Sequence, residues 1–208
     1  MNKKRESGIN RSDRWYGMDA GPNNHRQARA GEEVTDIEGS ERFESLVLPH
    51  LDAAYNFARW LTRDDHRARD IAQDALLRAL RFFDGFRGEN VRPWLLSIVR
   101  NTYFSSLKAT QREELRPDLD GEITGSALEA AYELDPSLTL ERKWDRERVN
   151  RALQSLPLEF REILILREME DLSYKQIADV AEIPIGTVMS RLSRARRLLA
   201  ERLALDED

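Results

Sequence analysis

The chain has 208 residues and a formal net charge of -5, with 33 Lys and Arg against 38 Asp and Glu. It contains no Cys, which excludes disulfide bonds and Cys-ligated zinc, and its three His have no companions at metal-ligand spacing. Hydrophobic residues make up 40% of the sequence, but no run approaches the roughly 20 apolar residues that a bilayer crossing needs. We therefore expect a cytoplasmic protein with no membrane insertion, no metal and no other cofactor.

Composition divides the chain into four segments. Residues 1–39 have few periodic apolar residues and are predicted to be a disordered N-terminal tail. Helical periodicity marks residues 40–110 as the first domain and residues 137–205 as the second. Between them, residues 111–136 form an acidic linker, in a stretch up to residue 141 that holds 9 acidic against 2 basic side chains.

The first domain is predicted to be helical throughout. Apolar residues recur at three- and four-residue steps from Phe43 to Leu61, as in an amphipathic helix that Pro49 divides in two. A second helix is expected from about Asp64 to Phe83. After a loop with two Gly, Pro93 lies in the first turn of a third helix.

A polar stripe runs along the second of these helices, opposite its apolar side. At 100° per residue its members fall within about 60° of one line. A Leu within a polar stripe indicates a surface that binds a partner. The stripe consists of Asp70, Gln73, Asp74, Leu77 and Arg81.

The second domain is predicted to contain a helix-turn-helix. A helix around Leu138–Leu156 is followed by another that Pro157 opens. Ser173 and Gln176 have the spacing of a capping box, which predicts a short helix beginning at Ser173. The segment EIPIG then turns the chain into a long helix over about Pro184–Leu203, and this order of elements is typical of DNA-binding domains.

The long last helix has one apolar side and one side of small, polar and cationic residues. Between Met189 and Arg202 there are five Arg and a single Glu. Short side chains allow a helix backbone to approach the major groove, and Arg reaches guanine edges or phosphates. With a Lys from the preceding helix, the candidate DNA-binding residues are Lys175, Thr187, Ser190, Arg191, Ser193, Arg194 and Arg197.

Several segments resemble those of extracytoplasmic-function sigma factors. LPLEFREILILRE, LSYKQIADVAE and IPIGTVMSRLSRARRLL are similar to region four of that family. RDIAQDALLRALRFF and FRGENVRPWLLSIVRNT are similar to the polymerase-docking helix and the promoter-melting segment of region two. The resemblance covers about 40–110 and 137–205, and it implies an all-α protein of two helical domains.

The resemblance also implies partners. Region two would bind the β′ clamp of core RNA polymerase through the polar stripe, and region four would recognise the minus-35 element near the β flap. An unstacked base of the minus-10 element would enter a pocket of aromatic, guanidinium and amide groups, whose chemistry suits a flipped base. The residues in that position are Phe86, Arg87, Gly88, Glu89, Asn90 and Asn101. A regulating anti-sigma factor is a further expectation from the family.

Two other interpretations remain open from the sequence. The chain could be a stand-alone helix-turn-helix regulator, or a sigma-like adaptor that holds an anti-sigma factor without engaging promoters. No phosphate-binding GxxxxGK[ST] loop or nucleophile elbow is present, so enzymatic activity is not expected. We also expect the acidic linker to lie against the basic last helix and to weaken DNA binding by the free protein.

Overall fold

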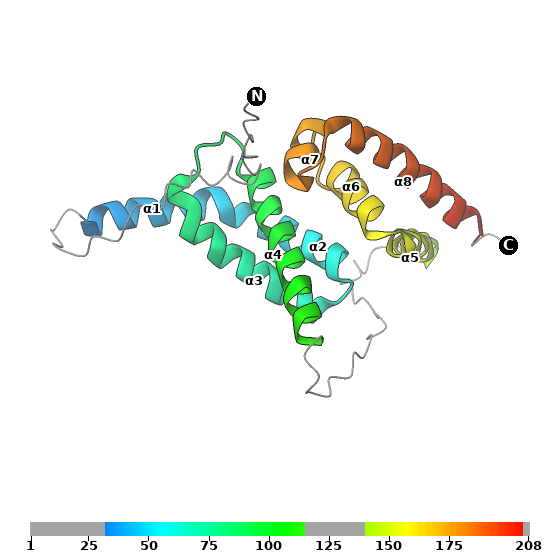
Figure 1. The fold of residues 1–208 in the computed structure, drawn as a ribbon, viewed down its shortest axis with the longest axis horizontal. Coiled ribbons are helices and arrows are strands. Elements are labelled where there is room, and N and C mark those ends of the chain that lie inside the picture. Colours follow the sequence, from blue (N-terminus) through cyan, green and yellow to red (C-terminus); the bar gives the residue numbers. More distant parts are fainter. Residues whose placement is uncertain (1–31, 115–139, 206–208) are drawn as a thin grey trace, which may run out of the picture.

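The computed structural model describes residues 32–114 and 140–205, and every element in these two ranges is a helix (Figure 1). The first domain comprises α1 (Glu32–Val47), η2 (Leu48–His50), α2 (Leu51–Thr62), α3 (Asp65–Phe82), η3 (Phe83–Gly85) and α4 (Val91–Glu114). The second comprises α5 (Leu140–Ser155), α6 (Leu158–Glu168), α7 (Tyr174–Ala181) and α8 (Ile185–Leu205). None of these helices combines the length and apolar character that a membrane crossing requires.

Two helices extend past the predicted domain boundaries. Helix α1 begins at Glu32, inside the segment predicted to be a disordered tail. The composition argument did not include this helix start. Helix α4 continues to Glu114, past residue 110. The rest of the predicted tail and most of the acidic linker lie outside the described residues.

Local signals explain where the helices of the first domain begin and end. Pro49 lies in η2, which separates α1 from α2 as predicted. Asp64 is the N-cap of α3, because its side chain accepts a hydrogen bond of 2.8 Å from the backbone N–H of Arg67. Arg59 of α2 and Asp65 of α3 form an ion pair at 2.6 Å across this junction. These contacts fix the antiparallel turn between α2 and α3.

The core of the first domain lies between α2, α3 and α4. Phe57, Leu61 and Trp94 are buried there. The side of α3 that carries Ile71 is buried as well. Phe83 forms an edge contact with Phe43 of α1, with ring centroids 5.2 Å apart. Most of the apolar residues predicted from periodicity thus form one packed interior, but Leu46 and Leu51 are exposed. The opposite face of α3 is exposed as well.

The second domain packs α6 and α7 against α8. The predicted capping box is present: the Gln176 backbone N–H donates to Ser173 Oγ at 3.3 Å, and the Ser173 N–H donates to Gln176 Oε1 at 2.8 Å. Helix α7 ends at Ala181, and its C-cap Glu182, with a φ of 55°, turns the chain toward α8. Ile177 on α7 and Leu192 on α8 are both buried in this interior. The helix-turn-helix predicted from the sequence is therefore confirmed.

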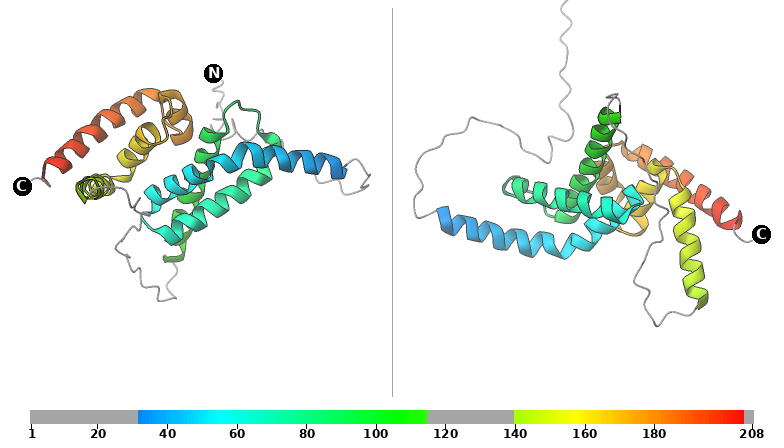
Figure 2. Two further views of the ribbon diagram at one scale, coloured as in Figure 1. Left: turned by 180° about the vertical axis from the view of Figure 1, so that it is seen from behind. Right: turned by 90° about the horizontal axis from the view of Figure 1, so that it is seen from below.

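The two domains lie against each other, with α7 packed on α4 and α6 packed on α2 (Figures 1 and 2). Their buried apolar residues form one continuous cluster. At the junction the backbone carbonyl of Leu156 accepts hydrogen bonds from Arg63 at 3.1 Å and from Arg161 at 3.2 Å. Burial, followed by the neighbouring charge of Arg63, lowers the pKa of Arg161 to about 10.

Replacing Ser173 by Ala removes the side-chain half of the capping box, so we expect the free energy of unfolding to fall by about 1 kcal/mol. Urea denaturation followed by circular dichroism measures this change. Ser105→Ala, at an exposed position within α4, is the control and should cause no comparable loss. Equal stabilities of the two variants would show that the cap does not hold the start of α7.

Candidate functional site

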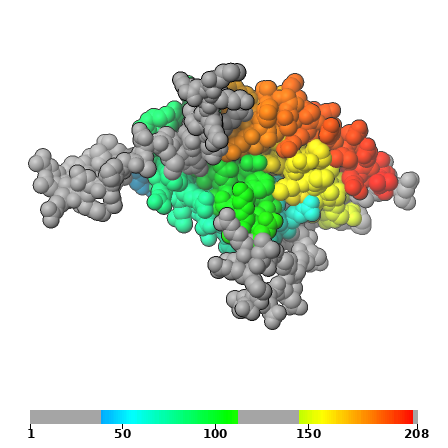
Figure 3. Space-filling model, in the orientation of Figure 1, coloured from blue at the N-terminus to red at the C-terminus, as the bar shows by residue number. Residues whose placement is uncertain are grey.

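The polar face of α8 is open to solvent. Ser190, Ser193, Arg194 and Arg197 are exposed and Thr187 is half-buried, while the opposite residues of the helix are buried. Figure 3 shows α8 as a continuous surface band along one edge of the molecule. Arg194 has no ion-pair or hydrogen-bond partner among the described residues. This face therefore presents a free guanidinium beside small hydroxyl groups.

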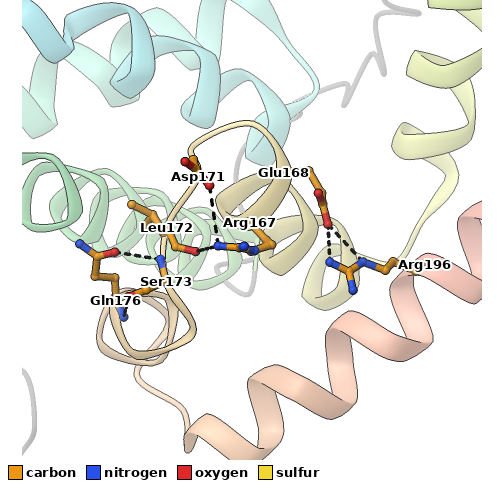
Figure 4. Close-up of polar contacts among 7 residues, drawn as sticks. All are labelled: Arg167, Glu168, Asp171, Leu172, Ser173, Gln176 and Arg196. Carbon is orange, nitrogen blue, oxygen red and sulfur yellow. Dashed lines mark hydrogen bonds and ion pairs between the residues drawn. The ribbon is translucent and has the colours of Figure 1, made fainter.

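Several contacts hold α7 and α8 in place relative to α6 (Figure 4). Arg167 donates to the carbonyl oxygen of Leu172 at 2.8 Å, which fixes the turn before α7. Glu168 at the end of α6 pairs with Arg196 of α8 at 2.7 Å. Lys175 is exposed in the first turn of α7. The arrangement presents a cation on each of the two helices of the helix-turn-helix.

Arg191 does not lie on the open polar face in this structure. Its guanidinium pairs with Glu159 of α6 at 3.4 Å, and its side chain is only 26% exposed. The pairing follows from position on the helix, because Arg191 lies about 100° from Ser190 and turns toward α6. In this structure Arg191 thus contacts α6, and its role as a DNA contact stays a prediction.

Two apolar residues at the start of α8 were missed by the sequence analysis. Ile185 is 50% exposed and Met189 is 54% exposed, one turn apart. They border the polar face next to Ser193. Apolar side chains on a groove-facing helix can contact the thymine methyl group. The sequence could have indicated them in the same way as Leu77, because each is an apolar residue that falls outside the apolar side of its helix.

The polar stripe of α3 is exposed along its whole length. Asp70, Gln73, Asp74 and Arg81 are all open to solvent. Leu77 is 66% exposed in the middle of the stripe, and Leu80, which the sequence analysis did not include, is 52% exposed beside it. Two exposed Leu residues surrounded by charges form a surface of the kind that protein partners cover.

Phe86 belongs to the core and is not free to stack on a base. Its side chain is 3% exposed. The ring lies 4.9 Å from Trp94 and 6.1 Å from Phe83, measured between centroids. An aromatic residue next to two Gly was expected to be exposed, but the loop folds back over the aromatic cluster. This corrects the predicted stacking role.

The rest of the loop remains at the surface, although two of its side chains are used locally. Arg87 folds back and donates to the backbone carbonyl of Asp84. Asn90 accepts a hydrogen bond of 3.1 Å from the backbone N–H of Arg92, at the start of α4. Gly88 and Glu89 are exposed. The loop therefore has a defined conformation before any ligand binds.

A cavity of about 240 Å³ lies between this loop, α1 and η2. Burial, followed by the charge of Arg92, lowers the pKa of His50 in its wall, so the imidazole is neutral at pH 7 and offers one donor and one acceptor. Hydroxyl and amide groups line the same space. The lining residues are Arg42, Ser45, Leu46, Pro49, His50, Phe86, Gly88, Glu89, Asn90 and Val91.

Asn101 lies apart from that cavity, under the second domain. Its amide nitrogen donates to Glu182 Oε1 at 3.4 Å. Two arginines of the same helix also meet carboxylates of the second domain: Arg92 pairs with Glu170, and Arg100 pairs with Glu162. In this structure the predicted minus-10 residues are therefore divided between the loop before α4, where Phe86 is buried, and α4, where Asn101 is half-buried beside the second domain.

Comparison with known proteins supports the division into two functional parts. The family model described as Sigma-70 region 2 matches residues 46–113, and the one described as Sigma-70, region 4 matches residues 146–199. The first match includes α3 and the loop before α4. The second includes the whole helix-turn-helix.

Several characterised relatives are similar over most of their length. The RNA polymerase sigma-H factor of Pseudomonas aeruginosa is 34% identical over 77% of this chain and 86% of its own. The ECF RNA polymerase sigma factor EcfG of Rhodopseudomonas palustris is 34% identical over 77% of this chain and 84% of its own. The ECF RNA polymerase sigma-E factor of Escherichia coli K12 is 35% identical over 62% of this chain and 70% of its own.

Solved structures agree with this relationship. The sigma factor RpoE of Bartonella quintana, in complex with the anti-sigma factor NepR, has a TM-score of 0.64 and 32% identity over 80% of this chain and 99% of its own. CnrH, in complex with the cytosolic domain of CnrY, shares the fold with a TM-score of 0.54 and 23% identity, over 86% of this chain and 99% of its own. The chain thus belongs to the ECF sigma factors, non-enzymatic proteins that direct RNA polymerase to promoters for the initiation of transcription.

Proposed function

We propose that the polar face of α8 recognises the minus-35 element in the major groove. The observation that carries this proposal is the exposed face of small residues around Arg194, whose guanidinium has no partner among the described residues. Ser190 and Ser193 allow close approach, and Lys175 on α7 lies where a phosphate contact would help to orient the domain. Arg197, which pairs with Glu201 at 3.6 Å on the exposed surface, exchanges that weak pair for a phosphate.

For the minus-10 element we propose the cavity next to the loop, together with Asn101. The neutral imidazole of His50, the hydroxyl of Ser45 and the exposed Glu89 provide donors and acceptors for the edges of an unpaired base. Phe86 supports the loop from the core, and Arg87 can release its local carbonyl contact to meet the backbone of the strand. Asn101 joins the site once the second domain has moved away.

The exposed stripe of α3 is proposed to bind the β′ clamp of core RNA polymerase. Leu77 supplies the apolar centre, and the acidic residues Asp70 and Asp74 supply charge for a basic partner surface. The second domain would contact the β flap. The cytoplasm, where core polymerase is found, is the proposed location. By likeness to Bartonella RpoE, an anti-sigma factor is a proposed regulator.

Run-off transcription tests the whole proposal. Purified chain and core polymerase are incubated with genomic fragments of the source organism, and the transcripts are mapped. Discrete start sites that require both components are expected. A stand-alone regulator would bind promoter fragments without core polymerase, and a sigma-like adaptor would give no transcripts; either outcome would reject the proposal.

Replacing Arg194 by Ala should weaken minus-35 recognition by about 1 to 3 kcal/mol, the value of a lost bidentate contact to a base. The measurement is the affinity of holoenzyme for a mapped promoter with an intact or a scrambled minus-35 element. Arg196→Ala is the matched control, because it removes the same charge from the same helix at a residue already paired with Glu168. If both variants lose the same affinity, the loss reflects total charge and not recognition.

Reversing both acidic charges of the stripe, with Asp70→Arg and Asp74→Arg, should prevent assembly with core polymerase. Because both positions are exposed, each substitution should change the free energy of unfolding by no more than about 0.5 kcal/mol. Co-purification with tagged core polymerase measures assembly. Glu41→Arg with Glu44→Arg, two exposed acidic residues of α1, is the control for total charge. Wild-type yield of complex with the Asp variant would contradict the proposed interface.

A further inference from the structure

Two arginines meet at the junction where α2 ends. Helix α2 packs on both α4 and α6, and its C-cap is Arg63 (Figure 1). The guanidinium groups of Arg63 and of Arg161 on α6 donate to the same carbonyl oxygen, that of Leu156, at 3.1 and 3.2 Å. Within the described residues neither guanidinium forms an ion pair. Two positive charges are therefore held close together with no carboxylate between them.

A third arginine and a tyrosine belong to the same group. Burial raises the pKa of Tyr103 on α4, and the charges of three arginines oppose this shift. In order of decreasing effect these are Arg161, Arg67 and Arg63. Because the interaction between charges falls off with distance, all three guanidinium groups lie near the phenol. We call Arg63, Arg67, Tyr103 and Arg161 the arginine cluster.

The arginine cluster has a buried base and an exposed rim. The base consists of Tyr103, which is 7% exposed, and Arg161, which is 3% exposed. The rim consists of Arg63 and Arg67, both of which are open to solvent. An anion that reaches the cluster from the solvent therefore meets the rim first and the base behind it.

The buried base has hydrogen-bond donors without acceptors. A guanidinium carries five N–H donors. Arg161 Nη1 donates to the carbonyls of Gln154 and Leu156, whereas its buried Nε has no partner within the described residues. The hydroxyl of Tyr103 has no partner there either. Since buried polar groups in folded proteins are nearly always hydrogen-bonded, unmet donors at one place indicate a site for an acceptor.

The carboxylates closest to the cluster along the chain are engaged elsewhere. Asp64 caps the start of α3, and Asp65 pairs with Arg59 of α2. Glu162 pairs with Arg100 of α4. The three guanidinium groups of the cluster thus have no counter-charge in the described part of the chain. A doubly charged anion balances three such groups better than a singly charged one does.

We propose that the arginine cluster binds a phosphate group, either as free phosphate or as the phosphate of a small ester. Guanidinium groups bind phosphate through a planar fork of donors, and these charge-assisted hydrogen bonds are stronger than neutral ones. The phenol of the base supplies one further donor. The proposal is independent of the function proposed above, because it uses neither the polar face of α8 nor the stripe of α3.

The bound phosphate is shared between the two domains. Arg161 belongs to the second domain, and the other three residues of the cluster belong to the first. A ligand that binds one arrangement of a protein better than another stabilises the first. Phosphate therefore holds α6 against α2 and raises the resistance of the full chain to unfolding.

Titration calorimetry of the full-length protein tests the site. The probes are inorganic phosphate and uridine 5′-monophosphate, at about pH 8, where phosphate groups are doubly charged, and at constant ionic strength. We expect saturable binding of one phosphate group per chain. Tighter binding of inorganic phosphate identifies free phosphate as the ligand, and tighter binding of the nucleotide identifies an ester. Failure of both probes to saturate would overturn the proposal.

Arg67→Gln and Arg69→Gln form a matched pair of variants. Each removes one exposed cation from α3, but the two positions lie about 160° apart around the helix. The Gln retains the backbone N–H through which Asp64 caps the helix. Arg67→Gln should weaken phosphate binding about tenfold, or about 1.4 kcal/mol, as expected for one hydrogen bond to a charged group. Arg69→Gln should leave the affinity unchanged, and an equal loss in both variants would reject the site.

Tyr103→Phe tests the buried base, because it removes the hydroxyl and keeps the ring. Its control is Tyr55→Phe, at a half-buried position of α2 outside the cluster. We expect about fivefold weaker phosphate binding from Tyr103→Phe alone. Phosphate also stabilises folded proteins by its exclusion from their surface, so the second measurement is the difference between variant and control in the rise of the thermal midpoint. Equal affinities and equal rises in this pair would show that the buried base does not contact phosphate.

Discussion

Helix α4 is the element on which both halves of the described structure depend. It packs against α1, α2 and α3 within the first domain and against α7 of the second. The ring of Trp94 near its start contacts both Phe83 and Phe86, so the same helix anchors the loop that precedes it. A residue change on α4 therefore affects the first domain, the loop and the contact between domains together, whereas the exposed faces of α3 and α8 can vary independently.

The distribution of charge matters more to this protein than its sum. A net charge of -5 would oppose a phosphate backbone at long range, yet dissolved salt screens exposed charges beyond about 8 Å at physiological ionic strength. The charged side chains close to a bound phosphate then determine whether it binds. The cations of α8 face outward, those of α4 face the second domain, and the acidic residues of α3 face away from both. The protein therefore has three local surfaces of different charge, and in this structure the one on α4 lies against the second domain.

Local sequence signals predicted the features that depend on neighbouring residues. The capping box of Ser173 and Gln176 and the exposed stripe around Leu77 follow from spacing of three and four residues along a helix. Contacts between distant residues could not be predicted in this way. Arg100 and Glu162 are 62 positions apart, and nothing in either segment specifies the partner. The burial of Phe86 has the same cause, since its loop is held by Trp94 and Phe83 and not by its own composition.

The carboxylates that cover α4 belong to the same chain as the arginines that they cover. They act as an intramolecular ligand, so the fraction of molecules in the closed arrangement is independent of how much protein is present. Synthesis of more protein raises the number of open molecules only in proportion. A partner changes the fraction of open molecules only if it binds the open or the closed state more tightly. A partner large enough to bind α3 and α8 at the same time and hold them apart would favour the open state. The contact between the two domains is thus set within each molecule, whatever the amount of protein.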